Sequence, residues 1–240
     1  MVDYVKLSPN HSGKRTKPID RLTIHCFVGQ VTCERIGKEF ENPKKNASCN
    51  YGIGKDGKII LIVDEANRSW CSSNAANDQR AITIECASDA TAPYAFNTAV
   101  YQALVDLTVD IMKRNKKHTL LYVSDKAKAL KYTPKEGEML MTFHRWFANK
   151  ACPGDWFMSK AEEFKNEVNK LLNSEAPVSK PKESVSIPKD EHVYTMPKLG
   201  EGLYAIARRS GISYAKIKEL NPDIRPPMYL VKLGKQVRIK

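Results

Sequence analysis

The segment from residue 174 to residue 190 limits what this chain can fold into, because it divides the chain into two unequal parts. It reads Ser-Glu-Ala-Pro-Val-Ser-Lys-Pro-Lys-Glu-Ser-Val-Ser-Ile-Pro-Lys-Asp, with three prolines, four serines and no aromatic residue. This composition is typical of an extended, solvated linker. We therefore predict a medium-sized domain over residues 1–173, a linker over 174–190 and a small domain over 191–240.

The larger part alternates strand-like and helix-like segments. Apolar runs predict strands over 22–26, 81–86 and 120–123, and a hairpin over 51–63 with an Asp56-Gly57 turn. Amphipathic spacing predicts helices over 31–40, 98–114 and 160–172, the second with Asn97 as its N-cap. Interleaved strands and helices predict an α/β domain built on one sheet flanked by helices.

Two polar residues interrupt these apolar strands. In Leu22-Thr23-Ile24-His25-Cys26 the side chains alternate, so His25 lies on the face opposite Ile24. Glu85 has the same position in Ile82-Thr83-Ile84-Glu85. A sheet face that carries both a histidine and a glutamate indicates the floor of a cleft. Taken alone, His25 also fits a hydrogen-bonded structural residue, and Glu85 also fits an ion pair with an arginine such as Arg80.

A second polar cluster lies between residues 142 and 156, where His144 is followed eight residues later by Cys152. This spacing fits a loop that folds back so that both side chains reach one ion. Two imidazoles and one thiolate are good ligands for Zn²⁺, and three protein ligands leave a fourth position for water or substrate. His25, His144 and Cys152 are therefore candidate zinc ligands, although Cys152 alone also fits a core thiol.

Composition narrows the functional classes without choosing among them. The net charge of +12 implies a polyanionic partner, such as nucleic acid, anionic lipid or a cell wall rich in phosphate and carboxylate. The basic residues are scattered, without the clustered runs or zinc-finger spacing that favour nucleic acid. No stretch approaches the ~18 apolar residues needed to span a bilayer. The remaining five cysteines form no Cys-x-x-Cys pair, and we interpret them as buried thiols.

The residues together resemble the type-2 N-acetylmuramoyl-L-alanine amidase family, which includes phage amidase-type lysozymes and peptidoglycan recognition proteins. The resemblance spans roughly residues 20–157 and rests on His25, Gly54-Lys55-Asp56-Gly57, Ile82-Thr83-Ile84-Glu85, His144 and Lys150-Ala151-Cys152-Pro153. It implies a mixed sheet flanked by helices, with zinc held by His25, His144 and Cys152 in a groove on one face.

The same resemblance assigns catalytic roles. Glu85 matches a glutamate that serves as general base in the bacterial branch, and Lys150 would stabilise the oxyanion. The implied reaction is zinc-promoted hydrolysis of the amide bond between N-acetylmuramic acid and L-alanine in bacterial peptidoglycan.

The chain departs from the family in two places. Some members have a catalytic tyrosine where this chain has Cys49, and Tyr51, on the same face of an ideal strand, is the alternative; we favour Glu85 as the base. Many bacterial members have Trp-His after the hairpin, whereas this chain has Trp70-Cys71, so we expect different substrate contacts there.

The small C-terminal part, residues 191–240, is similar to LysM, a βααβ module that binds glycans containing N-acetylglucosamine. The resemblance rests on a Gly200-Glu201-Gly202-Leu203 loop and an intact Asn221-Pro222 pair, followed by a last strand after Gly234. Between them the sequence predicts a first helix over residues 203–210 and a second over 213–220, which Asn221-Pro222 ends. It implies a glycan groove between two loops. Its candidate residues are Gly200, Glu201, Gly202, Asn221, Pro222, Asp223 and Ile224.

Both parts therefore point to peptidoglycan, and the leading hypothesis is an endolysin from a phage or prophage. The first residues lack the apolar run of a signal peptide, so we expect synthesis in the cytoplasm and release through a holin. We expect a monomer that contacts glycan strands and peptide stems, with no nucleic acid and no membrane insertion. The alternative is a non-catalytic recognition protein. A nucleic-acid-binding protein is a third reading that no motif supports.

Overall fold

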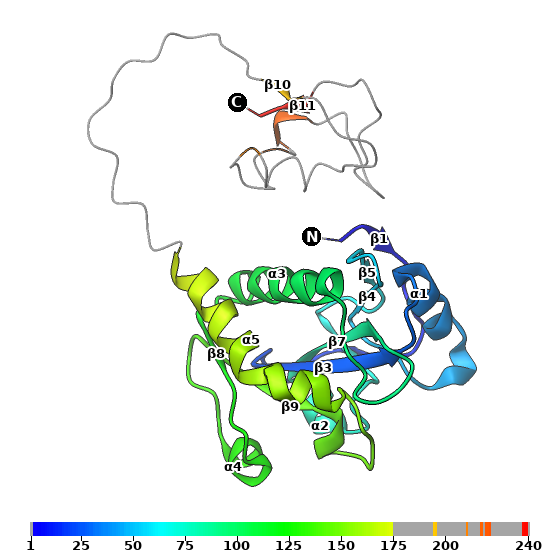
Figure 1. Cartoon of the computed structure of the whole chain (residues 1–240), viewed down its shortest axis with the longest axis vertical. Coiled ribbons are helices and arrows are strands. Elements are labelled where there is room, and N and C mark those ends of the chain that lie inside the picture. Colours follow the sequence, from blue (N-terminus) through cyan, green and yellow to red (C-terminus); the bar gives the residue numbers. More distant parts are fainter. Residues whose placement is uncertain are drawn as a thin grey trace. The chain divides into compact units, whose positions relative to one another are not determined.

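The computed structural model describes residues 2–174 and, further on, residues 194–195, 210, 217, 219–221 and 237–239. The chain divides into two compact units, residues 2–177 and residues 178–240 together with Met1, and each is described on its own (Figure 1). Among the described helices there is none with the length and apolarity that crossing a membrane requires.

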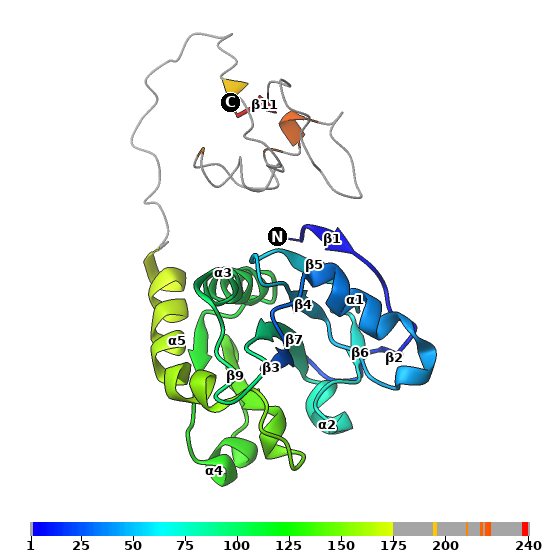
Figure 2. The same cartoon turned by 45° about the vertical axis from the view of Figure 1, so that its right-hand side comes forward.

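A seven-stranded sheet forms the centre of the larger unit, in the order β1-β5-β4-β7-β3-β9-β8 (Figures 1 and 2). Neighbouring strands run parallel except β4 and β5, which form the antiparallel hairpin expected from the Asp56-Gly57 turn. The strands are β1 (Tyr4–Val5), β3 (Arg21–Val28), β4 (Tyr51–Ile53), β5 (Ile59–Leu61), β7 (Ala81–Ser88), β8 (Thr119–Leu121) and β9 (Glu138–Phe143). The predicted mixed sheet is confirmed. A separate two-stranded sheet pairs β2 (His11–Lys14) with β6 (Asn67–Ser69).

The helices follow local signals in the sequence. They are α1 (Cys33–Glu41), α2 (Ala75–Asp78), α3 (Thr98–Arg114), α4 (Lys126–Lys131) and α5 (Asp155–Ser174), with short 3₁₀ turns η1 (Pro43–Lys45) and η2 (His144–Trp146). Helix α3 has the predicted span, and the Asn97 side chain accepts a hydrogen bond from Val100 N at 3.0 Å. Helix α5 begins five residues before the prediction, because the chain turns at Gly154, where φ is +93°, and becomes helical at once.

The two faces of the sheet differ in what covers them. Tyr51 on β4 is paired with Ile84 on β7, so both side chains lie on one face of the sheet. The Tyr51 hydroxyl lies 3.5 Å from the guanidinium of Arg114 on α3, so we call this face the α3 face. Helix α3 packs against β4 and β7, and α5 packs against α3 and β8. The other face carries α1, which packs against β4 and β5. Thr23, His25 and Glu85 lie on this second face.

Two glycines allow α1 to lie close to the sheet. A Cβ added at Gly52 would stand 2.9 Å from the Ile36 side chain and 3.0 Å from that of Ile60. A Cβ added at Gly37 within α1 would stand 2.6 Å from Ile60 Cδ1. At Gly52 the contacts include Ile36 Cβ at 3.3 Å, so a methyl group there would push α1 away from the sheet, whereas at Gly37 the one short contact is with the tip of the Ile60 side chain.

The cysteines are all free, and three of them match the buried-thiol prediction. Cys33, Cys49 and Cys86 are buried, but Cys26 and Cys71 are only half-buried. The prediction was wrong for these two, because β9 stops short of Cys26 along β3, and Cys71 lies in irregular chain beside Glu85.

The part of the smaller unit that the structure describes contains two strands and one stretch of helix. β10 (Tyr194–Thr195) pairs antiparallel with β11 (Val237–Arg238), which matches the two strands expected at the ends of the module. Residues 217, 219 and 220 are helical and fall within the predicted second helix, where Ile217 is buried. Of the predicted first helix, residues 203–210, only Ser210 is described, and it lies in a turn.

Asn50 joins the start of β4 to β7 and to the chain that follows β5, a role that no sequence pattern indicated. Its backbone N–H donates to Thr83 O at 3.1 Å, and its side-chain oxygen accepts from Thr83 N at 3.1 Å. Its amide nitrogen donates to Val63 O at 3.1 Å.

We expect Asn50→Ala to lower the free energy of unfolding by about 2–4 kcal/mol, because it leaves several buried groups without partners. Urea denaturation measures this, with the exposed Asn166→Ala on α5 as the control; equal effects of the two substitutions would contradict the role.

Candidate active site

The floor of the site is formed by β3 and β7, which pair in parallel over eight residues and place His25 beside Glu85. His25 is fully buried, and its Nδ1 lies 4.0 Å from Glu85 Oε1. β9 pairs with β3 only as far as Phe143 opposite Ile24, so the edge of β3 is free from His25 onwards. The next residue along the chain, His144, brings its ring centroid to 5.0 Å from that of His25.

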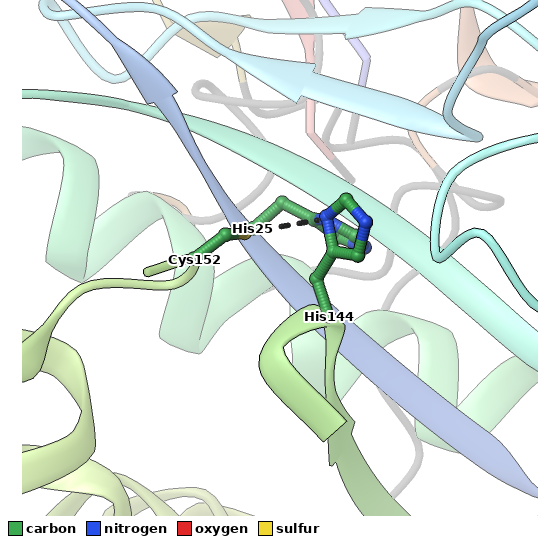
Figure 3. A group of neighbouring side chains, drawn as sticks. All are labelled: His25, His144 and Cys152. Atoms are coloured by element: carbon green, nitrogen blue, oxygen red, sulfur yellow. Dashed lines mark hydrogen bonds between the residues drawn. The ribbon is translucent and has the colours of Figure 1, made fainter. Parts of the chain in front are cut away.

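The loop after His144 folds back towards this free edge. Arg145 N donates to Cys152 O at 3.1 Å, and the Arg145 guanidinium binds the Ala151 carbonyl and, at 2.9 Å, Asp155 Oδ1. These bonds close the loop and bring Cys152 Sγ to 3.3 Å from His25 Nδ1. Figure 3 shows the three side chains, from β3, from η2 and from the loop, converging on one point.

The converging atoms fit a tetrahedral zinc ion. One ligand atom from each of His25, His144 and Cys152 lies within 4.8 Å of the others. Zinc bonds of about 2.3 Å to sulfur and about 2.1 Å to nitrogen hold those two donors about 3.5 Å apart, close to the 3.3 Å between Cys152 Sγ and His25 Nδ1. His144 Nε2 lies 3.0 Å from Ser73 Oγ, an arrangement that leaves Nδ1 available as a ligand.

The protonation states of the apoprotein also suit a metal. Burial, and then the neighbouring His144, lower the pKa of His25 well below its usual range, so its imidazole is neutral. A hydrogen bond with the Cys26 thiol, followed by burial and the charge of Glu85, raises the pKa of Cys152. The thiol is therefore protonated in the apoprotein and would release its proton when a metal binds.

Glu85 is a carboxyl group with an unusual pKa. Burial raises its pKa to about 7, against an ordinary value of 4.5. Its Oε1 accepts a weak hydrogen bond from the Cys71 thiol at 3.8 Å, whereas Oε2 has no partner among the residues that the structure describes. A carboxyl group that titrates near neutral pH, with one oxygen free, can take up and release a proton during a reaction. The interpretation of Glu85 as a partner of Arg80 is wrong, because Arg80 pairs with Asp20.

Cys71 belongs to the site, although sequence reasoning gave it only a place in the substrate groove. His25, Cys71 and Glu85 form a second set of donors within 4.8 Å of one another. Burial, and then the charge of Glu85, raise the pKa of the Cys71 thiol well above its ordinary value. The Cys71 thiol already donates a hydrogen bond to Glu85, and two imidazoles with one thiolate are a better donor set for a metal than one imidazole, a thiol and a carboxylate, so the set with Cys152 is the better metal site.

A groove of about 380 Å³ opens beside His144. Its lining comprises Asn46, Ala47, Arg68, Trp70, Cys71, Ser73, Asn74, Ala75, Asp78, His144 and Lys150. Lys150 is exposed there, and its charge contributes, after burial, to lowering the pKa of His144. Ser73 and Asn74 were not singled out from the sequence, because their places depend on the irregular chain between β6 and α2, and Arg68 was missed because it lies on the short strand β6.

Neither Tyr51 nor Cys49, the two positions considered for the family's catalytic tyrosine, lines the groove. Tyr51 faces α3, and its hydroxyl donates to Glu65 Oε1 at 2.8 Å, on the side of the sheet away from His25. Cys49 is buried with the residues of α1, and burial, followed by the charge of Glu85, raises the pKa of its thiol. The possibility that Tyr51 serves as the catalytic tyrosine is therefore wrong, and no tyrosine among the described residues takes its place at the groove.

Of the candidate glycan-binding residues, only Asn221 is described. It is buried, and its side-chain nitrogen donates to Ile217 O at 2.8 Å, at the end of the helical stretch. Gly200, Glu201, Gly202, Pro222, Asp223 and Ile224 lie outside the described residues. The glycan groove therefore stays a prediction.

Three converging donor side chains, a carboxyl group with a pKa of about 7 and an open groove are the parts that metal-assisted hydrolysis requires. The family comparison gives the same class. Residues 15–155 match the profile of the N-acetylmuramoyl-L-alanine amidase family, and the chain belongs to this family. Residues 198–240 match the LysM domain profile. The chain is thus a peptidoglycan amidase with a LysM domain.

Solved structures show that the fold is shared. The chain is similar to the structure of PlyL (15% identity, TM-score 0.52), covering 70% of this chain and 97% of that one. It is similar to a mutant endolysin from Bacillus subtilis (18%, TM-score 0.50; 70% and 99% covered). It is also similar to the Staphylococcus aureus hydrolase AmiA in complex with its ligand (14%, TM-score 0.51; 70% and 82% covered). No curated protein matches the chain in sequence.

The raised pKa of Glu85 gives a prediction about stability. Its pKa of about 7, compared with 4.5, means that ionisation of Glu85 disfavours the folded apoprotein as the pH rises between these values. The difference corresponds to about 3 kcal/mol at most. In chelator-treated protein, we expect Glu85→Gln to raise the free energy of unfolding at pH 8 and to change it little at pH 4.5.

Urea denaturation at the two pH values measures this effect. The exposed Glu136→Gln serves as the control and should show no pH-dependent difference. If Glu85→Gln raised the free energy of unfolding equally at both pH values, Glu85 would have an ordinary pKa in the folded protein.

Proposed function

We propose that this enzyme hydrolyses the amide bond between N-acetylmuramic acid and L-alanine, using a zinc ion held by His25, His144 and Cys152. The observation that carries the proposal is the convergence of these three donors within 4.8 Å, beside Glu85 and at the end of an open groove. Zinc is the ion that a set of two imidazoles and one thiolate favours. When bound, it would supply a Lewis acid that polarises the scissile carbonyl and activates water.

Glu85 is the general base in this proposal. At neutral pH a substantial fraction of a carboxyl group with a pKa of about 7 is ionised, and the same group is basic enough to accept a proton from the attacking water. The Cys71 thiol holds Oε1, so the free Oε2 is the atom that takes the proton. Glu85 then gives the proton to the nitrogen of the departing L-alanine, which leaves as a neutral amine.

Lys150 stabilises the oxyanion that develops on the carbonyl oxygen. Its ammonium lies on the lining of the same groove as His144, on a long, exposed side chain that can approach the substrate. A positive charge near a developing negative charge lowers the barrier only when water is largely excluded, so we expect the bound substrate to complete this site.

The LysM domain holds the enzyme on its polymer. We propose that residues 191–240 bind the glycan strands through the Gly200–Gly202 and Asn221–Ile224 loops, while the catalytic domain over residues 1–173 engages the peptide stems across the linker at 174–190. AmiA was solved in complex with its ligand, and an endolysin is among the structures with the same fold. Both support an enzyme that acts on the cell wall, and we propose an endolysin that reaches the wall by holin-mediated release.

Removal of the metal tests the reaction directly. We expect purified enzyme to generate free L-alanine amino termini from peptidoglycan and to leave the glycan strands intact, as read by mass spectrometry. A chelator should abolish this activity and zinc should restore it. Cys152→Ala should lose activity and most of its bound zinc, whereas Cys33→Ala, which removes a buried thiol in α1, should keep both. Wall binding by zinc-loaded protein without new amino termini would favour the non-catalytic recognition protein instead.

The role of Lys150 predicts a loss in turnover rather than in binding. We expect Lys150→Ala to reduce kcat by about 10²-fold with a smaller change in KM, because an oxyanion contact acts mainly in the transition state. Lys150→Arg should recover part of the rate, and the exposed Lys126→Ala on α4 should behave like the unsubstituted enzyme. An unchanged kcat in Lys150→Ala would remove Lys150 from the mechanism.

A further inference from the structure

A second pocket lies on the same face of the sheet, at the opposite end of β3. It has a volume of about 520 Å³ and lies beyond α2 from the catalytic groove, since Ala76 and Gln79 of the α2 segment line it while Asn74 and Ala75 line the groove. Its full lining is Thr16, Lys17, Pro18, Asp20, Arg21, Ala76, Gln79, Arg80 and Thr133. We call it the β3-start pocket.

Positive charge dominates this pocket. Lys17, Arg21 and Arg80 contribute three basic groups, and Asp20 is the single acidic group on the lining. Both carboxylate oxygens of Asp20 accept hydrogen bonds from Arg80, with Arg80 Nε at 2.8 Å from Oδ1. Asp20 therefore neutralises Arg80 and leaves Lys17 and Arg21 without a matching anion on the pocket lining.

Arg21 is the unusual member of this set. The residue is only 8% exposed, and its Nη1 donates to the neutral side-chain oxygen of Asn77 at 3.1 Å. Its Nε is buried and has no hydrogen-bond partner within residues 2–174. Burial, and then the nearby charge of Arg80, lower the pKa of Arg21, and the charge of Asp20 offsets this lowering only in part. A buried guanidinium without a carboxylate partner is costly, because it loses hydration without gaining a counter-ion.

We propose that the β3-start pocket binds an oxyanion, a carboxylate or phosphate group, through Arg21 with Lys17 at its rim. A guanidinium presents its N–H groups as a planar fork that matches the two oxygens of such a group. The lysine adds a charge that draws the anion from solvent. An oxyanion here supplies the counter-ion that Arg21 lacks and gives its free N–H groups an acceptor.

The position of the pocket indicates where the oxyanion comes from, and this step rests on the proposed function. Arg21, Thr23 and His25 alternate along one face of β3, so the Cα atoms of Arg21 and His25 are roughly 13 Å apart. A wall polymer whose scissile bond lies at His25 extends over that distance. Its peptide stems carry carboxylates, and its attached anionic chains carry phosphodiesters. We infer that one of these groups occupies the pocket during substrate binding.

Inorganic phosphate is the first probe of the site. Isothermal titration of the full chain with phosphate, at constant ionic strength, should give saturable binding. The exposed Lys17→Glu should weaken it about tenfold or more, and Ala76→Glu, which places a carboxylate on the pocket lining, should compete with the anion. Lys170→Glu on α5 makes the same change in net charge outside the pocket and should leave binding unchanged. These variants avoid the buried Arg21, whose replacement risks misfolding.

Competition for the phosphate site then distinguishes the two sources of the oxyanion, the peptide stems and the phosphodiester chains. Displacement of phosphate by a soluble peptide-stem fragment identifies a carboxylate, and displacement by glycerol phosphate identifies a phosphodiester. Absence of saturable phosphate binding, or equal weakening by Lys17→Glu and Lys170→Glu, overturns the site. Phosphate binding that neither fragment displaces overturns its assignment to the wall polymer. The titration requires no turnover, so a failed amidase assay and a failed oxyanion site give different results.

Discussion

The parallel pairing of β3 with β7 is the constraint on which the rest of the site depends. Eight consecutive residue pairs fix the register and place His25 beside Glu85 on one face, while Ile24 and Ile84 are buried on the other. A slip of β3 by one residue would turn His25 to the α3 face and place Ile24 or Cys26 beside Glu85 instead. Every other part of the site, including the loop that brings Cys152, is positioned against this pair.

A buried polar network connects the two ends of this face. Asn77 accepts a hydrogen bond from Arg21 and donates to Thr23 Oγ1 at 2.9 Å, and Thr23 Oγ1 in turn lies 2.7 Å from Thr142 Oγ1. The threonines and the asparagine satisfy one another where an apolar face would be expected. Such a network fixes side chains in one arrangement, because each member loses its partner if another moves. The floor of the groove is therefore rigid before any substrate arrives.

Local sequence patterns were sufficient to predict which residues lie on the polar face of the sheet and where α3 begins and ends. Strand alternation alone places His25 and Glu85 on one face, and the Asn97 cap with its apolar stripe sets the span of the helix. The orientation of Tyr51 was not predictable, since it depends on the register of β4 against β7. The approach of Cys71 to Glu85 was not predictable either. The backbone N–H groups of Cys71 and Ser72 donate to the Asp78 side chain, and these bonds fix where the Cys71 thiol lies. Such contacts between irregular segments leave no periodic signal.

Gly52 beneath α1 limits how this enzyme can change over evolution. A methyl group at this position would stand 2.9 Å from the Ile36 side chain, so α1 and the β4–β5 hairpin keep a fixed separation. A change on that side of the fold needs compensating substitutions in α1. The groove lining also contains exposed residues such as Asn46 and Ala75, which belong neither to the metal donor set nor to the core. These residues can be exchanged for others that fit a different wall polymer while the chemistry is kept.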